Sequence, residues 1–333
     1  MASTIYAVDN ELYCFWSNDL CADALTFLDS VDAGYFAYVA DEALKHLGDE
    51  TTEMRAATNL RIAFFHGLES LLMLIAAAVQ APKCPQAYLG QCTNDALRSL
   101  LKKIDEGAVL PQYNRHLKVR SWPGIAEEVL RCTGETGAEQ QRLVGTFANL
   151  WADLASKQRN QVAIWEYNSL KHGFRIQPGG FTLKIEANGP NPSNPLELTI
   201  GEKFGTGFQV LTKPGDDANT NRSRVTERHN VIWRVEDLAH LVYLISASLR
   251  NVVTYLRVYN GGPPPYVIAR MTESAPAVPR STSTSISLAE PVPGARPTTK
   301  VELEQANQRN QLLRENRSND GISKAPEIDA GHT

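Results

Sequence analysis

The sequence has little cysteine, and its cysteines show no metal-binding spacing. Only five occur in 333 residues, at Cys14, Cys21, Cys84, Cys92 and Cys132, and no two are separated by two residues. Zinc knuckles and thioredoxin-like sites use that spacing, and disulfide-built domains contain far more cysteine. We therefore expect no metal, no cofactor and no disulfide framework, and the cysteines are typical of a reduced cytoplasmic protein.

The sequence also lacks a long hydrophobic run and a basic N-terminal leader. Its longest apolar stretch, Leu71 to Val79, spans nine residues, whereas a bilayer-spanning helix needs about 20. The first residues are acidic and contain no apolar segment of the kind found in secretory signals. These absences predict a cytoplasmic protein without a membrane partner.

The basic residues are almost missing from one part of the chain. Residues 1–54 carry eleven acids and a single base, Lys45, for a net charge of −10, whereas residues 55–261 carry a net charge of +6. The whole-chain value of −4 is therefore an average over unlike segments. Such an asymmetry bears on partners rather than on fold, and we expect the acidic segment to pack near a basic groove and compete with polyanions for it.

Helical periodicity dominates what is present. Apolar residues at three- and four-residue spacing predict an amphipathic helix over 20–47, a buried helix from about 51 to 80, shorter helices at about 93–106 and 123–132, a long one at 138–172, and a second buried helix at 233–259. The two apolar helices cannot hide their faces alone, so we expect them to pack on each other.

One stretch breaks the helical pattern. Between 174 and 212 apolar residues alternate with polar ones and are interrupted by glycine and proline, which predicts short antiparallel strands. From 262 to 333 the chain is rich in Pro, Ser and Thr and poor in large apolar residues, which is typical of disorder, with a weak helix at 300–316.

The predicted fold is mainly α: a bundle of five to six helices with a small inserted antiparallel β-sheet and a disordered C-terminal tail. The predicted organisation is an acidic N-terminal helical segment at 1–54, a bundle at 55–261 with the β insertion at about 174–212, and the tail at 262–333.

Polar side chains occupy the core-facing side at the end of the predicted 138–172 helix. On a continuous helical wheel, one core-facing stripe begins at Leu154 and turns polar toward Asn168 and His172. An imidazole titrates near neutral pH and suits acid–base work. The alternative is a structural one, in which His172 is favoured by the helix dipole beside Lys171 and Gly173 is the cap.

A second inward candidate lies in the first buried helix. His66 and Glu69 are three residues apart and therefore neighbours, so Glu69 could orient His66, and Gly67 between them predicts the close approach of another backbone. A hydrogen-bonded pair in a helix interface is the structural alternative. A metal site of His66, Glu69 and His172 lacks an obvious fourth ligand.

These segments resemble a known family. The string Tyr167-Asn168-Ser169-Leu170-Lys171-His172-Gly173, after a long helix carrying His66-Gly67-Leu68-Glu69, is similar to HEPN-type helical domains of toxin–antitoxin, phage-defence and RNA-processing proteins. The resemblance covers about 55–175 and 230–260. It implies a helical bundle, a dimer, and a metal-independent endoribonuclease site near a helix end. Here an N-x-x-K-H pattern replaces the family's R-x(4–6)-H, and only Asn168 and His172 carry over.

The resemblance implies a function, and the sequence supplies two sets of candidate site residues. His172 would be the general acid or base, Asn168 would position the phosphate, and Lys171 would offset charge, with His66 and Glu69 as further candidates. Cationic side chains suited to RNA phosphates are Arg159, Arg175, Arg222, Arg224 and Arg228. The expected partners are RNA and a second copy or another protein. The alternative is a non-catalytic helical protein-interaction module.

Overall fold

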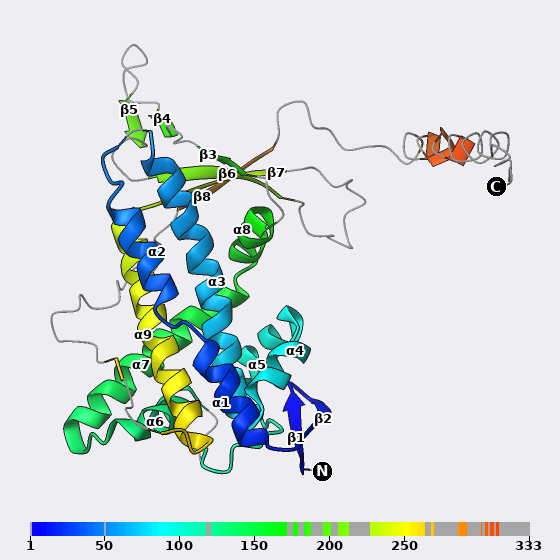
Figure 1. The fold of residues 1–333 in the computed structure, drawn as a ribbon. Coiled ribbons are helices and arrows are strands. Elements are labelled where there is room, and N and C mark those ends of the chain that lie inside the picture. Colours follow the sequence, from blue (N-terminus) through cyan, green and yellow to red (C-terminus); the bar gives the residue numbers. More distant parts are fainter. Residues whose placement is uncertain are drawn as a thin grey trace, which may run out of the picture. The chain divides into compact units, whose positions relative to one another are not determined.

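The structure, a computed structural model, is mainly helical, as predicted (Figure 1). It describes residues 2–49, 51–117, 121–171, 176–178, 183–187, 196–200, 206–212, 227–263, 268–269, 286–291, 301, 304–305, 307–309 and 311–312. Two compact units divide the chain: Met1–Val210 with Asn230–Leu288, and Leu211–His229 with Ala289–Thr333. The packing discussed below belongs to the first unit.

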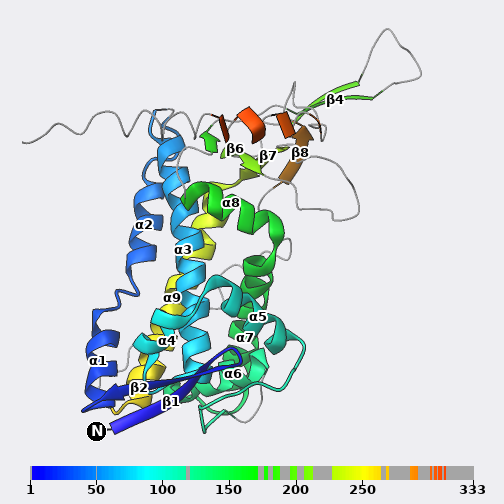
Figure 2. The same ribbon diagram turned by 90° about the vertical axis from the view of Figure 1, so that its right-hand side faces the viewer.

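The centre of the bundle is a pair of long helices. Helix α3 (Glu53–Gln80) and helix α9 (Val235–Tyr259) lie side by side and share the most extensive interface of the fold (Figures 1 and 2). Their apolar faces are buried, with Leu68, Leu72 and Val252 fully inaccessible. Each fully buried side chain of this size contributes about 1.5–3 kcal/mol, so this pairing forms the core, as the two apolar periodicities predicted.

Helix α3 also has the composition of a membrane helix. Among the described residues it is the one helix long and apolar enough to cross a bilayer, with a mean hydropathy of 2.0 over its most apolar stretch. However, 72% of that stretch is buried inside the protein. Its apolar surface is thus already covered by protein, as in a core helix of a bundle.

The N-terminal segment differs from its prediction. An antiparallel hairpin of β1 (Ala2–Val8) and β2 (Glu11–Ser17) precedes the helices, and the predicted helix over 20–47 is two helices, α1 (Leu20–Ser30) and α2 (Tyr35–Leu44). The break follows from a turn in which the Asp32 carboxylate accepts a hydrogen bond from the Gly34 N–H. Helix α2 packs on both α3 and α9.

Gln80, at the end of α3, fastens the hairpin to the bundle. Its side chain is fully buried, its Oε1 accepts from the Asp9 N–H at 2.9 Å, and its Nε2 donates to the carbonyls of Asp9 and Pro111 at 2.8 and 2.6 Å. Asp9 has a φ of 54° at the tip of the hairpin. Because buried amides need partners, this exchange fixes where the hairpin turns.

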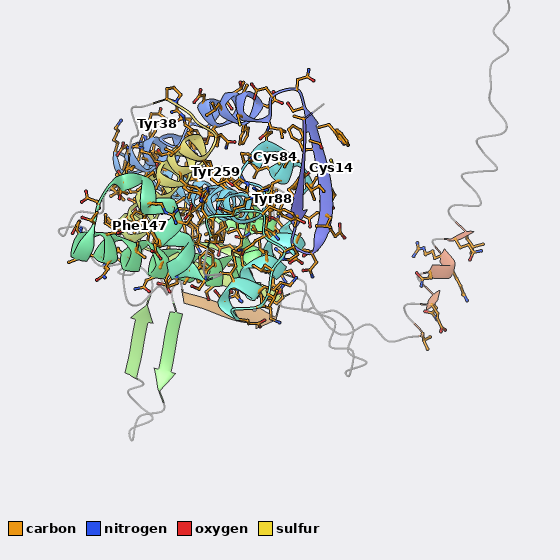
Figure 3. All side chains as sticks on the ribbon, turned by 90° about the horizontal axis from the view of Figure 1, so that it is seen from below. Cys14, Tyr38, Cys84, Tyr88, Phe147 and Tyr259 are labelled. Carbon is orange, nitrogen blue, oxygen red and sulfur yellow. The ribbon has the colours of Figure 1, made fainter. Side chains whose placement is uncertain are left out.

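Shorter helices surround the central pair. They are α4 (Pro85–Gln91), α5 (Asn94–Asp105), α6 (Trp122–Leu130), the 3-10 turn η1 (Arg131–Thr133), α7 (Gly137–Arg159) and α8 (Gln161–Lys171). The helices expected near 93–106 and 123–132 are therefore present, and α4 is an additional one. Figure 3 shows Phe147 of α7, Tyr88 of α4 and Tyr259 of α9 within the bundle, viewed along it.

The predicted single helix over 138–172 is wrong, because it ends and restarts at Asn160. Asn160 has an extended backbone with φ −70° and ψ 126°. Its Oδ1 accepts hydrogen bonds from the N–H groups of Val162 and Ala163 at 2.9 and 3.2 Å, so it closes α7 and caps α8. A helical wheel assumes one continuous helix, so it assigns wrong directions to residues that follow this break. The core-facing stripe inferred from the wheel therefore applies to α7 and not to α8.

The inserted strands are present where the alternation placed them. They are β3 (Ile176–Pro178), β4 (Leu183–Ala187), β5 (Leu196–Ile200) and β6 (Thr206–Thr212). Strand β4 pairs antiparallel with β5, and β3 pairs antiparallel with β6. Two unpredicted strands, β7 (Glu227–Trp233) and β8 (Ile286–Pro291), complete a sheet in the order β3-β6-β7-β8. The rest of the predicted tail lies mostly outside the described residues, but the described positions between 301 and 312 are helical.

Candidate functional site

A buried ion pair holds α8 against α3. The Arg61 guanidinium donates to Glu166 through Nε to Oε1 at 2.6 Å and through Nη2 to Oε2 at 2.9 Å. Both side chains are almost fully buried, and Arg61 lies over the rings of Phe64, Phe65 and Trp233 at 5.2–5.4 Å. A bidentate pair of this kind is directional as well as strong, so it sets the register of α8 along α3.

This register brings sequence-predicted residues from the two helices into one pocket. His66 and Glu69 of α3 and Lys171 of α8 line a cavity of about 470 Å³, together with Tyr167 of α8 and apolar side chains that include Phe27 of α1 and Leu89 of α4. We call it the α3–α8 pocket. His66 and Lys171 are exposed and Glu69 is partly buried, so the polar groups line a mouth that opens to solvent.

Tyr167 connects the three polar residues. Its ring meets the His66 imidazole edge-on at 5.7 Å between centroids, and the Lys171 ammonium lies 5.0 Å from the centre of the same ring. Burial, and then hydrogen bonding with the Glu69 carboxylate, raise the pKa of the Tyr167 hydroxyl. The tyrosine therefore remains a neutral donor at physiological pH and orients Glu69.

Glu69 retains an unused acceptor. Its Oε2 atom is buried, and no hydrogen-bond partner for it is found in the part of the chain that the structure describes. The sequence interpretation had Glu69 orienting His66, but its described partner is Tyr167 instead. A buried carboxylate oxygen without a donor is costly.

Gly67 lies where another part of the fold approaches closely. A Cβ at this position would meet Ile245 Cγ2 at 3.0 Å and Phe36 Cδ1 at 3.2 Å. The sequence analysis predicted the close approach of another backbone at this glycine. The structure shows instead the close approach of side chains from α2 and α9.

Asn168 and Lys171 lie on different recesses. Asn168 is exposed and borders a recess shared with Arg98 and Lys157, whose volume of about 10 Å³ holds no more than a water. His172, with which it was paired on the wheel, belongs to 172–175, which the structure does not describe. Asn168 therefore does not line the α3–α8 pocket.

The arginines proposed for phosphate contacts lie mostly outside the described side chains, and Arg159 does not line this pocket. Arg159 forms an ion pair with Asp105. Arg175, Arg222 and Arg224 fall outside the described residues, and of Arg228 only the backbone, in β7, is described. Among these five, only Arg159 has a described side chain, and its charge is already paired.

The described residues contain no cluster of three or more His, Cys, Asp or Glu side chains that could hold a metal ion. The described residues that line the pocket supply imidazole, carboxylate, ammonium and phenol groups. Sequence reasoning assigned no role to Tyr167, although its spacing of four residues from Lys171 places the two side chains on one helical face. Comparison with protein-family models, with curated proteins and with solved structures finds no match to this chain.

Proposed function

We propose that this protein contacts RNA at the α3–α8 pocket and acts there as a metal-independent endoribonuclease, in the manner that its resemblance to HEPN-like domains implies. The observation that supports the proposal is the convergence of His66, Glu69 and Lys171 on one open cavity from two separate segments of sequence. Cleavage of RNA by its own 2′-hydroxyl requires a base, an acid and a cation near the phosphate, and these three side chains supply them.

The reaction would proceed by proton transfer at two oxygens. Glu69 would accept the proton of the 2′-hydroxyl through its carboxylate, which lines the pocket, while the 2′-oxygen attacks phosphorus. The bond from phosphorus to the 5′-oxygen then breaks, and the His66 imidazolium gives its proton to that leaving oxygen. Lys171 offsets the negative charge that builds on the phosphoryl oxygens. The products are a 2′,3′-cyclic phosphate and a free 5′-hydroxyl, so no proton is lost overall.

The test is cleavage of RNA by the purified full chain in the presence of EDTA. Variants His66→Ala, Glu69→Gln and Lys171→Ala should each lower the rate by at least about 100-fold, as expected when an acid–base or charge-stabilising group is removed. His116→Ala is the matched control, because His116 is an exposed histidine that borders a different cavity. His172→Ala tests the histidine that the motif singles out. Equal rates in His66→Ala, Glu69→Gln and wild type would reject the assignment.

A second function, a protein-interaction module, is favoured by a different observation. One face of the β1–β2 hairpin carries Ile5, Leu12 and Trp16, which are 57%, 63% and 63% exposed, and the strand register places them on the same side. A contiguous exposed apolar face is typical of an interaction surface. If it binds a second copy or another protein, Leu12→Ser/Trp16→Ser should abolish the complex in size-exclusion chromatography without changing RNA cleavage.

A further inference from the structure

A second cavity adjoins the α3–α8 pocket and shares one residue with it. It lies between α2 and α3 and has a volume of about 580 Å³, with Tyr35, Tyr38, Arg55, Asn59 and His66 among its lining residues. We call it the α2–α3 groove. His66 borders both cavities. An extended ligand strand that contacts the imidazole can therefore occupy both cavities at once.

A continuous face of α3 forms the floor of both cavities. Arg55, Asn59, His66 and Glu69 follow one another at intervals of four, seven and three residues, which keeps them on one side of a helix of 3.6 residues per turn. The basic and amide side chains lie toward the start of this face, and the candidate acid–base pair lies farther along it. The order is that of a binding subsite leading into a reaction site.

The groove presents aromatic rings to solvent. Tyr35 and Tyr38 are 53% and 60% exposed, and Tyr38 lies toward the outer edge of the bundle in Figure 3, away from Tyr88. Exposed aromatic rings beside a cation are the stacking platform used for single-stranded nucleic acids, because every base has a π-face and each stacked base contributes about 1–3 kcal/mol. Arg55 is also exposed and supplies that cation.

The other ionisable side chains that line the groove, Glu42 and His46, already have partners within the protein. The Glu42 carboxylate accepts from Lys45 at 2.5 Å, and His46 Nδ1 lies 3.0 Å from the Thr52 hydroxyl. The pairing of Glu42 leaves less negative charge to repel a phosphate. The aromatic rings with Arg55 and Asn59 are then the groups left to recognise a ligand, which favours a nucleotide over a basic peptide.

We propose that the α2–α3 groove binds an unpaired nucleotide next to the scissile phosphate, so that the substrate class is single-stranded RNA. The inference rests on the proposed function. Stacking requires a base that is splayed out of its helix, and the bases of a duplex are already stacked. Tyr35 and Tyr38 hold the base, Arg55 contacts its phosphate, and the strand continues past His66 into the α3–α8 pocket.

The test measures binding without cleavage. The probe is a short fluorescent single-stranded RNA in which every 2′-hydroxyl is methylated, with the same sequence as a duplex for comparison, and the readout is fluorescence anisotropy. Tyr35→Ala/Tyr38→Ala should weaken binding about tenfold or more, whereas Tyr35→Phe/Tyr38→Phe, which keeps both rings, should bind as wild type does. Tyr113→Ala removes an exposed tyrosine that does not line the groove and should change nothing. Arg55→Ala should lower the slope of log Kd against log salt concentration by about one, because one fewer counterion is released on binding.

The outcomes separate this inference from the proposed cleavage. Equal binding by wild type and Tyr35→Ala/Tyr38→Ala, in a protein that cleaves RNA, overturns the groove and leaves the nuclease. Tyrosine-dependent binding by a protein that never cleaves supports the groove and rejects the nuclease. Tighter binding of the duplex than of the single strand overturns the inference, and so does the absence of binding to either. Because both tyrosines are exposed, circular dichroism should show all variants folded.

Discussion

Arg61 and Glu166 form a doubly hydrogen-bonded ion pair in the interior, 105 residues apart in sequence, with side-chain exposures of 5% and 3%. The pair joins α3, which carries His66 and Glu69, to α8, which carries Tyr167 and Lys171. Removal of one partner leaves the other as a buried unpaired charge, which typically costs about 3–5 kcal/mol.

We therefore expect Glu166→Ala to lower the free energy of unfolding by about 3–5 kcal/mol in chemical denaturation. Glu42→Ala, which removes a carboxylate from the exposed pair with Lys45, should cost no more than about 1 kcal/mol. The double variant Arg61→Met/Glu166→Met should recover much of the loss. Similar costs for Glu166→Ala and Glu42→Ala would mean that the buried pair does not hold α8.

Gly67 and Gly145 allow the same substitution to be compared in two surroundings. Replacing a helical glycine by alanine stabilises a helix by about 0.5–1 kcal/mol. At Gly145 of α7 an added Cβ meets nothing within 4 Å, so Gly145→Ala should raise the melting temperature. At Gly67 it would press on Ile245 and Phe36, and overpacking of this kind costs about 1–3 kcal/mol. Thermal unfolding should therefore shift in opposite directions, and a stabilising Gly67→Ala would show that Phe36 can move aside.

Asn160 should be a stability determinant despite its exposure. Asn160→Ala removes the oxygen that accepts from two α8 N–H groups, and such a loss costs about 1 kcal/mol. Thr136, the N-cap of α7, makes no side-chain capping bond, so Thr136→Ala should have a smaller effect on the urea midpoint. Because α8 carries Lys171, the RNA cleavage proposed above should fall in Asn160→Ala as well. Equal midpoints for the two variants would contradict the capping role.

Two thiols with raised pKa values predict a loss of stability at high pH. Burial raises the pKa of Cys84 to about 12 and that of Cys132 to about 11. A raised native pKa stabilises the fold below the ordinary thiol pKa, and this stabilisation is lost as the pH rises through the native value. The free energy of unfolding should therefore decrease from about pH 9 upward, less so in Cys84→Ala/Cys132→Ala.

Alkylation of the native protein near neutral pH offers a direct check on the same thiols. Cys14 and Cys21 are exposed and Cys84 is buried, and only thiolates react readily. Peptide mass spectrometry should find iodoacetamide on Cys14 and Cys21 first. Labelling of Cys84 at the same rate would contradict its burial.

The acidic residues of the N-terminal segment serve local purposes that their net charge conceals. Throughout the described part of residues 1–54, every aspartate and glutamate side chain accepts a hydrogen bond or forms an ion pair. Asp19 caps α1, Asp29 pairs with Arg257 at 3.1 Å, and Asp41 accepts from Tyr243 at 2.5 Å. The expected competition with polyanions therefore cannot be tested by removing the segment.

Deleting residues 1–48 should instead destabilise the bundle. The deletion removes the buried side chains of Leu28, Ala40 and Ala43 and uncovers α3 and α9, on which α2 packs. We expect a lower melting temperature and increased binding of a hydrophobic dye. A truncated protein that unfolds cooperatively at the wild-type temperature would contradict this and would make the RNA-competition experiment informative after all.

The sequence predicts those parts of the fold that long apolar periodicity governs. Helices α3 and α9 begin and end within about two residues of their predicted limits, because their apolar side chains leave no alternative to burial. The hairpin at residues 2–17 was missed although its signal is present: Asp9-Asn10 between two runs rich in aromatic and β-branched residues is a hairpin turn. The break at Asn160 was missed because asparagine fits both a cap and a helix surface.

The candidate site was predictable only in pieces. His66 and Glu69 are neighbours on one helix, and Lys171 belongs to a separate motif, so each is visible locally. Their meeting depends on the contact between Arg61 and Glu166 across the bundle, which no local pattern contains. Asn168 illustrates the opposite error, since a wheel continued through a hidden helix boundary assigned it to a face where it does not lie.

The separation of α3 and α9 along the chain has a consequence for synthesis on the ribosome. Helix α3 emerges early, with an apolar surface comparable to that of a membrane helix, and its principal partner emerges only after α4 to α8 and the strands up to β7. During that interval the described elements that contact it most are β1, α2, α4, α5, α7 and α8, and the face that α9 will cover stays exposed. The nascent chain therefore exposes the most apolar surface in the middle of translation, when chaperones that bind exposed apolar helices would act on it.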